Sequence, residues 1–299
     1  MVSIGSYLDT LRQITAHPLN RKRKASAVID YLRWNLGQRL LDRDHVLPLA
    51  GDARVILSRR QNYATLAYTC ALWDFSEMMF LLHALRPTDK FIDIGANVGT
   101  YSVLASKVAG ASSIAFEPIP TTHDELMQNL RLNNILDKAV GHRLCLGSTN
   151  GKIHMTIGRG ALDHVATQGD TGKLLETEVV RLDDVLQDGG CRLIKIDAEG
   201  YEAEILSGAT KTLQNPELIG LIVELNGAGL RYGHSNESVH ETLLRYDFAP
   251  YRYDGVDRSL YKEPTFNTSG LNTLYLRDLG LIERRLRDAS AVTVRGQTL

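Results

Sequence analysis

The fold is decided by the stretch Phe91-Ile92-Asp93-Ile94-Gly95-Ala96-Asn97-Val98-Gly99-Thr100-Tyr101. An apolar run that carries one acid ends in two glycines four residues apart, and a segment with helical spacing follows over 100–108. The pattern predicts a strand, a tight turn and a helix N-terminus, where α/β proteins let a ligand approach backbone N–H groups. Gly95 permits the turn, and Gly99 lets the helix start close to a strand or a ligand.

A second acid follows at the spacing that nucleotide sites use. The segment Ser113-Ile114-Ala115-Phe116-Glu117-Pro118 predicts the next strand, with Glu117 at its carboxyl end, 22 residues after Gly95. In βαβ nucleotide sites an acid at this position receives the two ribose hydroxyls. We therefore expect Glu117 to bind a ribose.

The identity of the nucleotide depends on the turn. A dinucleotide prefers the denser Gly-x-Gly-x-x-Gly, because its two phosphates rest on the backbone. Here Asn97 replaces the middle glycine, and Asp93 is a poor neighbour for a phosphate. S-adenosylmethionine (SAM), with its ribose, amino group and carboxylate, fits better than NAD; a plain strand, turn and helix with an accidental acid is the other alternative. The predicted cofactor-binding residues are Asp93, Gly95, Asn97, Gly99, Thr100, Glu117, Ser148 and Asp197.

Composition suits a water-soluble enzyme. The chain has 299 residues, 43% hydrophobic and 23% charged, and a net charge of −1, so no global field favours nucleic acid. The sequence shows neither an apolar run of 18 residues nor a leader pattern. Three widely spaced cysteines suggest buried, reduced thiols. We therefore expect a cytoplasmic protein without a transmembrane segment.

The N-terminal region differs from the rest of the chain. Helical spacing over 7–14 and 25–41 flanks the basic run Arg21-Lys22-Arg23-Lys24, and 54–58 predicts a short strand. A basic region of this kind allows peripheral membrane contact. We favour a helical arm that packs on the catalytic domain or on a second subunit, so a homo-oligomer stays open. The predicted units are 1–73 (mainly helical extension), 74–278 (catalytic domain) and 279–299 (C-terminal helix and tail).

From residue 74 onward strands and helices alternate, which predicts a mostly parallel, doubly wound α/β sheet. Two last strands without a helix between them predict an antiparallel hairpin at one edge. A Gly-rich piece over 150–180, with a strand at 152–157, predicts a hairpin-like insertion over the carboxyl edge. The expected helices are 75–85, 100–108, 122–133 and 238–246, and the expected sheet strands are 90–94, 112–117, 143–146, 193–197, 218–225, 249–253 and 272–277.

Several motifs in this order carry a family resemblance. They are Asp93–Gly99, Phe116-Glu117-Pro118, Leu182-Asp183-Asp184, Lys195-Ile196-Asp197-Ala198-Glu199-Gly200-Tyr201-Glu202, Leu206-Ser207-Gly208-Ala209 and Ile222-Val223-Glu224-Leu225. Over roughly residues 74–278 the chain resembles the FkbM family of SAM-dependent methyltransferases. The resemblance implies a class I methyltransferase (Rossmann-like) fold and SAM as methyl donor, with S-adenosylhomocysteine (SAH) as product. It further implies O-methylation of sugars and natural products, mostly by bacterial enzymes.

The acceptor side is predicted from the strand ends. Asp197 follows the fourth strand beside Asp93, and Glu224 ends the fifth, so either carboxylate can orient or deprotonate an acceptor hydroxyl. His164, in the insertion, is the third candidate base. Lys195 lies on the same strand side as Asp197 and can pair with it. Asp197 and Glu224 can also form two legs of a Mg²⁺ site, but no tight cluster in the sequence forces one, and a metal is not favoured.

Overall fold

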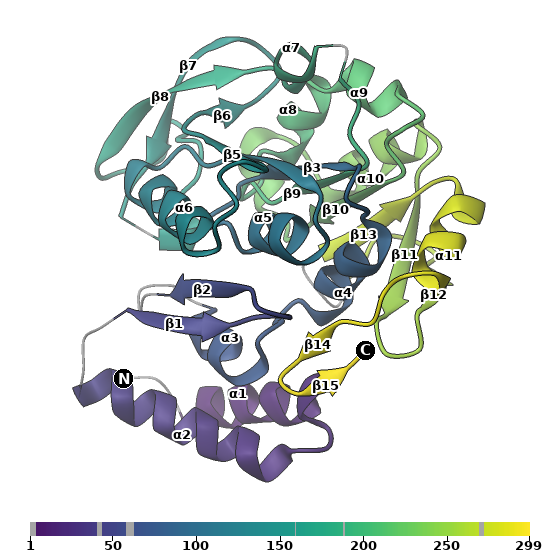
Figure 1. Ribbon diagram of the computed structural model, residues 1–299. Coiled ribbons are helices and arrows are strands. Elements are labelled where there is room, and N and C mark those ends of the chain that lie inside the picture. Colours follow the sequence, from purple (N-terminus) through teal and green to yellow (C-terminus); the bar gives the residue numbers. More distant parts are fainter. Residues whose placement is uncertain (1–3, 41–43, 58–62, 159, 188, 269–271) are drawn as a thin grey trace.

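The computed structural model of the chain describes residues 4–40, 44–57, 63–158, 160–187, 189–268 and 272–299. An eight-stranded sheet lies at the centre of this part of the chain (Figure 1). From edge to edge its strands are β12 (Ser259–Lys262), β11 (Ala249–Asp254), β13 (Asn272–Leu276), β10 (Gly220–Glu224), β9 (Leu193–Ile196), β3 (Lys90–Ile94), β4 (Ser112–Phe116) and β5 (Ala139–His142).

Strands β10, β9, β3, β4 and β5 run parallel, whereas β13 is antiparallel to both β10 and β11. The predicted mostly parallel sheet with an antiparallel pair is therefore confirmed. The two predicted last strands, β11 and β13, do pair, but they are not the edge. Strand β12, which sequence reasoning missed, pairs with β11 and forms the edge instead.

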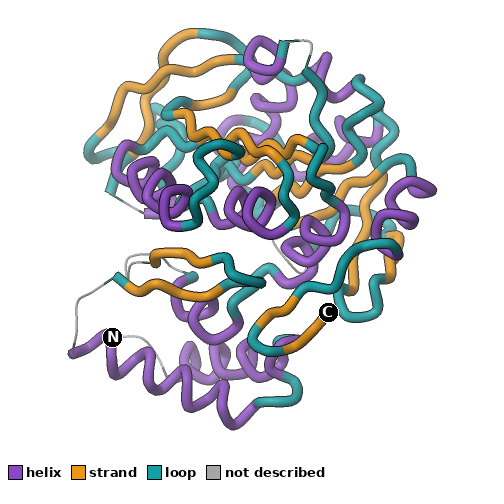
Figure 2. Tube along the Cα trace, viewed as in Figure 1, coloured by secondary structure: helices purple, strands orange, loops and turns teal. Residues whose placement is uncertain are grey.

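Helices cover both faces of the sheet (Figures 1 and 2). Alternate strand residues separate the two cores: Phe91 and Leu193 face one, Ile92 and Ile194 the other. The first face carries α4 (Phe75–Ala84), α5 (Thr100–Val103) with its π-helical continuation Leu104–Val108, α6 (Pro120–Leu132) and α11 (Leu279–Arg287). The second carries α7 (Leu182–Leu186), α8 (Glu202–Ser207), α9 (Thr210–Gln214) and α10 (Asn236–Leu244).

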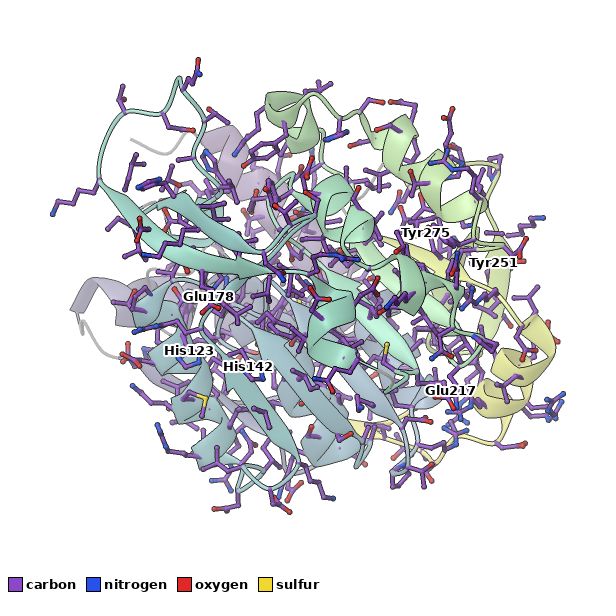
Figure 3. The ribbon with its side chains drawn as sticks, turned by 90° about the horizontal axis from the view of Figure 1, so that it is seen from above. His123, His142, Glu178, Glu217, Tyr251 and Tyr275 are labelled. Atoms are coloured by element: carbon purple, nitrogen blue, oxygen red, sulfur yellow. The ribbon has the colours of Figure 1, made fainter. Side chains whose placement is uncertain are left out.

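The strand predicted at 143–146 is a strand only at Cys145–Leu146 (β6), which lies outside the central sheet. The sheet strand is β5, Ala139–His142, and its last residue stacks on Phe116 with 5.5 Å between ring centroids (His142 is labelled in Figure 3). Val140 is half exposed, and a Cβ on Gly141 would lie 2.7 Å from Sδ of Met127. Strand β5 therefore has an exposed valine and a glycine where a buried strand would have apolar residues. For this reason the sequence gives only a weak signal for it.

The insertion forms a small sheet of its own. Strand β6 (Cys145–Leu146) pairs with β8 (Leu174–Val180), which pairs antiparallel with β7 (Gly151–Thr156); η3 (Gly160–Leu162) lies between β7 and β8. The predicted hairpin over 150–180 is therefore confirmed. Cys145 is one of three cysteines, all buried and free of disulfides as predicted; the others are Cys70 and Cys191.

The N-terminal region packs against the sheet's helices. It comprises α1 (Ile4–Ala16), η1 (Pro18–Asn20), α2 (Lys24–Leu40), β1 (His45–Pro48), β2 (Arg54–Leu57) and α3 (Ala64–Cys70). Leu41 and Ser58, the ends of two predicted elements, lie outside the described residues. Two asparagines hold the edge of β2: Asn133 accepts from the N–H of Arg54 at 2.9 Å, and Asn129 from that of Ile56 at 2.7 Å.

The C-terminal hairpin, β14 (Thr293–Val294) and β15 (Gln297–Thr298), closes on the N-terminal helices. Between its strands, Arg295 donates to the carbonyl of Tyr68 at 2.8 Å and to Asp30 at 2.7 Å. Arg23 of the basic run also pairs with Asp30 at 2.7 Å. Across the described ranges, no helix has both the length and the apolarity that crossing a bilayer requires.

Candidate functional site

The glycine turn follows β3 and is held by the neighbouring strands. The N–H groups of Gly95 and Ala96 both donate to the carbonyl of Phe116, each at 3.0 Å. Gly95 has φ 70°, and a Cβ at this position would lie 1.7 Å from the carbonyl oxygen of Asp197. Glycine is therefore the residue that fits the turn.

The N–H groups of this turn are used within the protein. Asn97 (φ 51°) donates to Glu117 at 3.0 Å, Val98 donates to the side chain of Asn97 at 2.8 Å, and Gly99 donates to the carbonyl of Ala96 at 2.8 Å. With Gly95 and Ala96 bonded to Phe116, five consecutive N–H groups are occupied. A phosphate needs such groups free, so this turn suits a ligand without phosphates.

Asp93 and Gly99 position the helix that follows the turn. The buried Asp93 carboxylate accepts from the N–H of Ser102 at 3.0 Å and from its hydroxyl at 2.7 Å. A Cβ on Gly99 would lie 2.2 Å from Cδ1 of Leu126 in α6. Burial raises the pKa of Asp93. Together these contacts fix β3, α5 and α6 around the turn.

Glu117 ends β4 and faces the turn. Its Oε2 accepts from the N–H of Asn97 and its Oε1 from that of Ile119, both at 3.0 Å. Burial raises the pKa of Glu117 to about 7, although these two hydrogen bonds oppose the shift. The side chain is 6% exposed and lines the cavity beside the turn.

The first cavity, of about 480 Å³, opens beyond the carboxyl ends of β3, β4, β9 and β10. On one side lie the turn and Glu117, and on the other lie acids from β9 and β10. The insertion supplies an apolar wall that includes Leu144, Leu146, Met155 and Val165. Of the predicted site residues, Asp93, Gly95, Asn97, Thr100, Glu117, Asp197 and Glu224 line this cavity.

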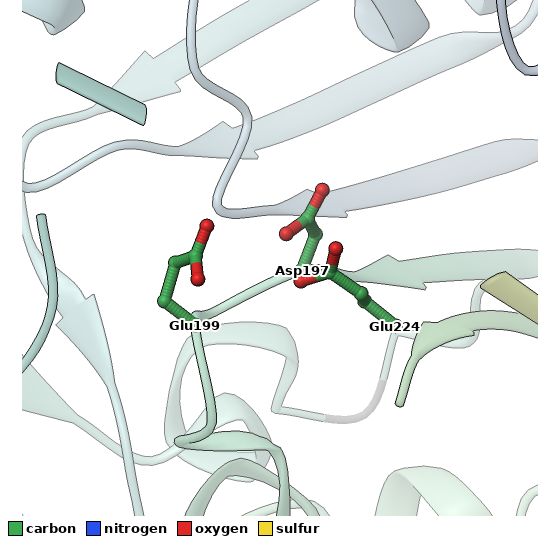
Figure 4. A group of neighbouring side chains, drawn as sticks. All are labelled: Asp197, Glu199 and Glu224. Atoms are coloured by element: carbon green, nitrogen blue, oxygen red, sulfur yellow. The ribbon is translucent and has the colours of Figure 1, made fainter. Parts of the chain in front are cut away.

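Three acids meet at the far end of the first cavity. Asp197 and Glu199 follow β9, and Glu224 ends β10 (Figure 4). One carboxylate oxygen from each lies within 4.8 Å of the others. Glu199 has φ 51°, a left-handed conformation that such side chains seldom adopt and that clusters at functional sites.

Lys195 is the partner of this cluster, as predicted. Its Nζ lies 2.7 Å from Oδ2 of Asp197 and 4.9 Å from the centroid of the Tyr101 ring, and the residue is 4% exposed. Burial lowers the pKa of Lys195, but the charges of Asp197 and Asp93 outweigh burial and raise it overall. The buried ammonium is therefore charged at neutral pH.

The pair Asp197 and Glu224 holds a proton on Glu224. Burial, followed by the charge of Asp197, raises the pKa of Glu224 to about 10. Burial also acts to raise the pKa of Asp197, but the Lys195 ammonium outweighs it and the pKa lies below its usual value. The Nδ2 of Asn226 donates to Oε2 of Glu224 at 2.9 Å. At neutral pH Asp197 is a carboxylate and Glu224 a carboxylic acid.

A divalent cation fits this cluster poorly. Asp197 already has an ammonium at 2.7 Å, and a second cation would repel Lys195 inside a buried site. Burial, then Asp197 and Glu202, raises the pKa of Glu199 to about 7, so that side chain is only partly ionised at neutral pH. The cluster therefore does not favour a metal-assisted reaction.

Two buried polar atoms in the wall have no partner. Within the described residues, neither Oγ1 of Thr100 nor Oδ1 of Asn272 makes a hydrogen bond, and both residues line the first cavity. Thr100 is 4% exposed. Buried polar atoms are normally hydrogen-bonded, so both atoms are suited to a polar ligand.

His164 and Ser148 make their contacts outside the acid cluster. The ring of His164 contacts Asp170 (Nε2 to Oδ1, 3.2 Å) and the carbonyl of Leu162 (Nδ1, 3.0 Å). Ser148 donates to Glu204 at 2.5 Å. Neither residue is among those that line the first cavity, and Gly99 is not either.

Sequence reasoning missed several wall residues. Tyr63 donates to Oδ1 of Asn97 at 3.3 Å, and its ring stacks on Trp73 with 4.6 Å between centroids. The hydroxyl of Tyr101 donates to Asp74 at 3.0 Å. Asp74 directly precedes α4, and an acid at that position normally indicates a helix cap, not a site residue.

Known proteins resemble this chain in sequence. A family model, the methyltransferase FkbM domain, matches residues 93–250, just over half of the chain. The hexuronic acid methyltransferase AglP of Haloferax volcanii is 30% identical over 156 residues, which cover 49% of this chain and 59% of that protein. The 31-O-demethyl-FK506 methyltransferase FkbM of Streptomyces tacrolimicus is 28% identical over 169 residues, covering 45% and 65%.

The matches with curated relatives are partial, since the chain spans about three-fifths of their length. Among solved structures, TYW2 of P. horikoshii in complex with MeSAdo has a TM-score of 0.40 and 13% identity, covering 79% of this chain and 70% of that one.

Proposed function

Because the chain belongs to the FkbM methyltransferase family, we propose that it transfers a methyl group from SAM to a hydroxyl of a sugar, polysaccharide or natural product. One observation carries the proposal. A single cavity has the glycine turn and Glu117 at one end and the Asp197–Glu224 pair at the other. The first end suits a nucleoside without phosphates, and the second suits a hydroxyl group.

The residues of the first cavity fit SAM, which when bound supplies an electrophilic methyl group on a sulfonium. Glu117 would hold the ribose hydroxyls, since its carboxylate lines the cavity and accepts only two backbone N–H groups. Thr100 would give its unpaired hydroxyl to a polar group of the ligand. Ile119 and Leu144 would cover the adenine, because both are apolar wall residues.

Asp197 is the proposed partner of the acceptor hydroxyl. Its carboxylate accepts the hydroxyl's hydrogen bond, and it takes the proton as the oxygen attacks. A carboxylate whose pKa Lys195 lowers is a weak base, so orientation is its larger contribution. Orientation of the reacting groups can lower the barrier by roughly 7–11 kcal/mol. A general base typically accelerates a reaction about 10²–10⁴-fold, which is the smaller effect. Glu224, as a protonated acid hydrogen-bonded to Asp197, keeps that carboxylate in place.

The acceptor class is supported by the relatives. One is named for a hexuronic acid and another for a 31-O-demethyl compound, so both names fit an oxygen acceptor. Transfer to oxygen is also what a carboxylate partner such as Asp197 suits.

Two other functions compete with this one. An NAD-dependent enzyme would need the turn's N–H groups for its phosphates, and these are occupied. A non-catalytic SAM-binding protein would share the first cavity. Such a protein would bind SAH but transfer no methyl group.

Ligand binding tests the proposal. SAH at about 100 times its Kd should stabilise the protein by about 2.7 kcal/mol, a shift easily seen in thermal unfolding, whereas NAD should cause none. Glu117→Ala should abolish most of the SAH shift, and Glu178→Ala, an exposed acid on β8 (labelled in Figure 3), should keep it. No shift with SAH or SAM would overturn the methyltransferase assignment, and SAH binding without methyl transfer to any acceptor would favour the non-catalytic reading.

A further inference from the structure

A second cavity, of about 440 Å³, adjoins the first. The two share Trp73, Asp74 and Asn272 as a common wall. Asn272 lies beside Glu224, its register partner across β10 and β13, and Asp74 is close enough to Lys195 and Asp197 for their charges to act on its pKa. The second cavity therefore adjoins the acid cluster through Asn272 and Asp74.

The second cavity is built outside the family-matched region. Its described walls come from residues 17–21, 73–77, 252–256, 267 and 272, and none of these lies within 93–250. The first cavity, in contrast, takes most of its lining from 93–250. The segments that flank the family domain thus combine to form a site of their own, with the N-terminal extension contributing through His17 and Arg21.

The lining of the second cavity combines apolar side chains with charged side chains of both signs. Arg21 and Arg252 supply the positive charges and Asp74 and Glu77 the negative ones, from three different segments. Burial, followed by the charge of Asp74, raises the pKa of Glu77 to about 8, so its carboxyl can donate as well as accept a hydrogen bond near neutral pH. Asn272 brings the unpaired Oδ1 described above.

An aromatic ring accompanies these polar groups. Trp73 lines both cavities, and stacking on Tyr63 at 4.6 Å and 22° between planes fixes its ring. Donors, acceptors and a fixed aromatic ring together suit a polyhydroxylated ring, which has hydroxyls at its edge and C–H groups on its faces. A wholly apolar acceptor would leave Oδ1 of Asn272 without a hydrogen bond.

Volume supports a separate site for the acceptor. Ligand cavities usually measure roughly 300–1,000 Å³ for one drug-sized ligand, so a first cavity of about 480 Å³ suits SAM and little more. We propose that the second cavity binds the acceptor, and that the acceptor carries a sugar ring there, with its reacting hydroxyl reaching Asp197 past the wall of Trp73 and Asn272. This inference rests on the proposed function. It adds that the segments flanking residues 93–250 select an acceptor with a sugar ring.

Val256→Trp tests the placement. Val256 lines the second cavity only and is 54% exposed, so a larger side chain there fills the cavity from its rim without entering the core. The matched control is Val140→Trp on the edge strand β5, where the valine is 50% exposed and lines neither cavity. Glu77→Gln, which keeps the size of the side chain, is the second variant.

The probes are methyl β-D-glucopyranoside and methyl β-D-glucuronide, measured by saturation-transfer NMR with the protein saturated with SAH. Wild type and Val140→Trp should bind at least one glycoside, and Val256→Trp should weaken that binding about tenfold or more. Glu77→Gln should weaken it in the same direction. SAH affinity, measured by calorimetry without glycoside, should stay within about twofold in all variants, which also reports that they fold.

Three results would overturn the inference. Equal glycoside binding by Val256→Trp and wild type would place the acceptor elsewhere. Binding of SAH but of neither glycoside by wild type would refute the sugar ring. Failure of wild type to bind SAH would refute the proposed function, and this inference with it.

Discussion

Glu224→Gln should stabilise the folded protein at neutral pH, although it changes a residue of the acid cluster. Burial and Asp197 raise the pKa of Glu224 from 4.5 to about 10, so the folded protein keeps a proton that the unfolded chain releases. Holding that proton at pH 7 costs about 2.3RT for each pH unit above the unfolded pKa, or about 3.4 kcal/mol in total. Glutamine is neutral at every pH and avoids this cost.

The amide can also replace the hydrogen bonds of the acid. Its N–H can donate to Asp197 as the protonated carboxyl does, and its carbonyl can accept from Asn226, which lies 2.9 Å from Oε2 of Glu224. The free energy of unfolding of Glu224→Gln at pH 7 should therefore exceed that of wild type by up to about 3 kcal/mol. For the same reason turnover should fall much less in Glu224→Gln than in Asp197→Asn, because only Asp197 acts as a carboxylate.

The pH dependence gives the clearest measurement. Since the folded pKa is the higher one, the wild-type stability from Glu224 is complete below about pH 4.5 and is lost as pH rises towards 10. The variant lacks this loss, so its advantage over wild type should grow by about 1.4 kcal/mol for each pH unit above 5. Urea denaturation of both proteins at several pH values measures this difference. The other titrating acids contribute equally to the stability of the two proteins, so their effect cancels.

Glu283→Gln on α11, an exposed position, is the control and should show no such growth. A stability difference that does not change with pH would refute the assignment of the proton to Glu224. A Glu224→Gln variant less stable than wild type at pH 7 would do the same.

Four further predictions follow from the site. Lys195→Met should destabilise the protein by about 1–3 kcal/mol in urea denaturation, less than a fully buried pair would cost, since the Asp197 side chain that loses its partner is 33% exposed; an unaffected midpoint would show that Asp197 is neutral. Gly95→Ala should lose SAH binding in calorimetry, because its Cβ would lie 1.7 Å from a carbonyl oxygen, whereas Gly151→Ala, with no atom within 4 Å, should bind normally. His164→Ala should keep its turnover from about pH 6 to about pH 9, because the histidine does not line the cavity; a clear loss in a folded variant would restore it as the base. Turnover should survive treatment with EDTA, and an enzyme that recovers only on addition of Mg²⁺ would revive the metal site.

Much of the fold could be predicted because parallel strands are buried on both faces. Strands β3, β4, β9 and β10 are therefore short apolar runs, which stand out between the polar segments around them. The glycine turn adds a steric signal, since Gly95 has no room for a side chain. Edge strands lack both signals. Strands β5 and β12 contribute exposed or partly exposed residues, and sequence reasoning displaced the first and missed the second.

The site divides in a similar way. Residues at strand ends, such as Asp197, Glu117 and Glu224, were predicted to converge because parallel strands end at one edge of the sheet. His164 is a loop residue, and its direction depends on which neighbour its ring contacts; here Asp170 holds it. Asn272 comes from a strand that sequence reasoning took as an edge. Its place in the wall depends on pairing with β10, which local sequence does not report.

The charge balance of the first cavity connects the protonated acid to the proposed cofactor. Of the described residues that line this cavity, Lys195 is the only lysine or arginine, whereas seven are acids: Asp74, Asp93, Glu117, Asp163, Asp197, Glu199 and Glu224. Glu224 reduces the imbalance by retaining its proton, and burial raises the pKa values of Glu117 and Glu199 to about 7, so both are partly protonated at neutral pH. A cationic ligand reduces the same imbalance, because it pairs with carboxylates that are costly to bury alone. In the proposed reaction the cavity receives a sulfonium and is left with a neutral thioether. If the proposed function holds, the excess of acids would favour SAM over SAH, and loss of the ligand's charge would help to drive product release.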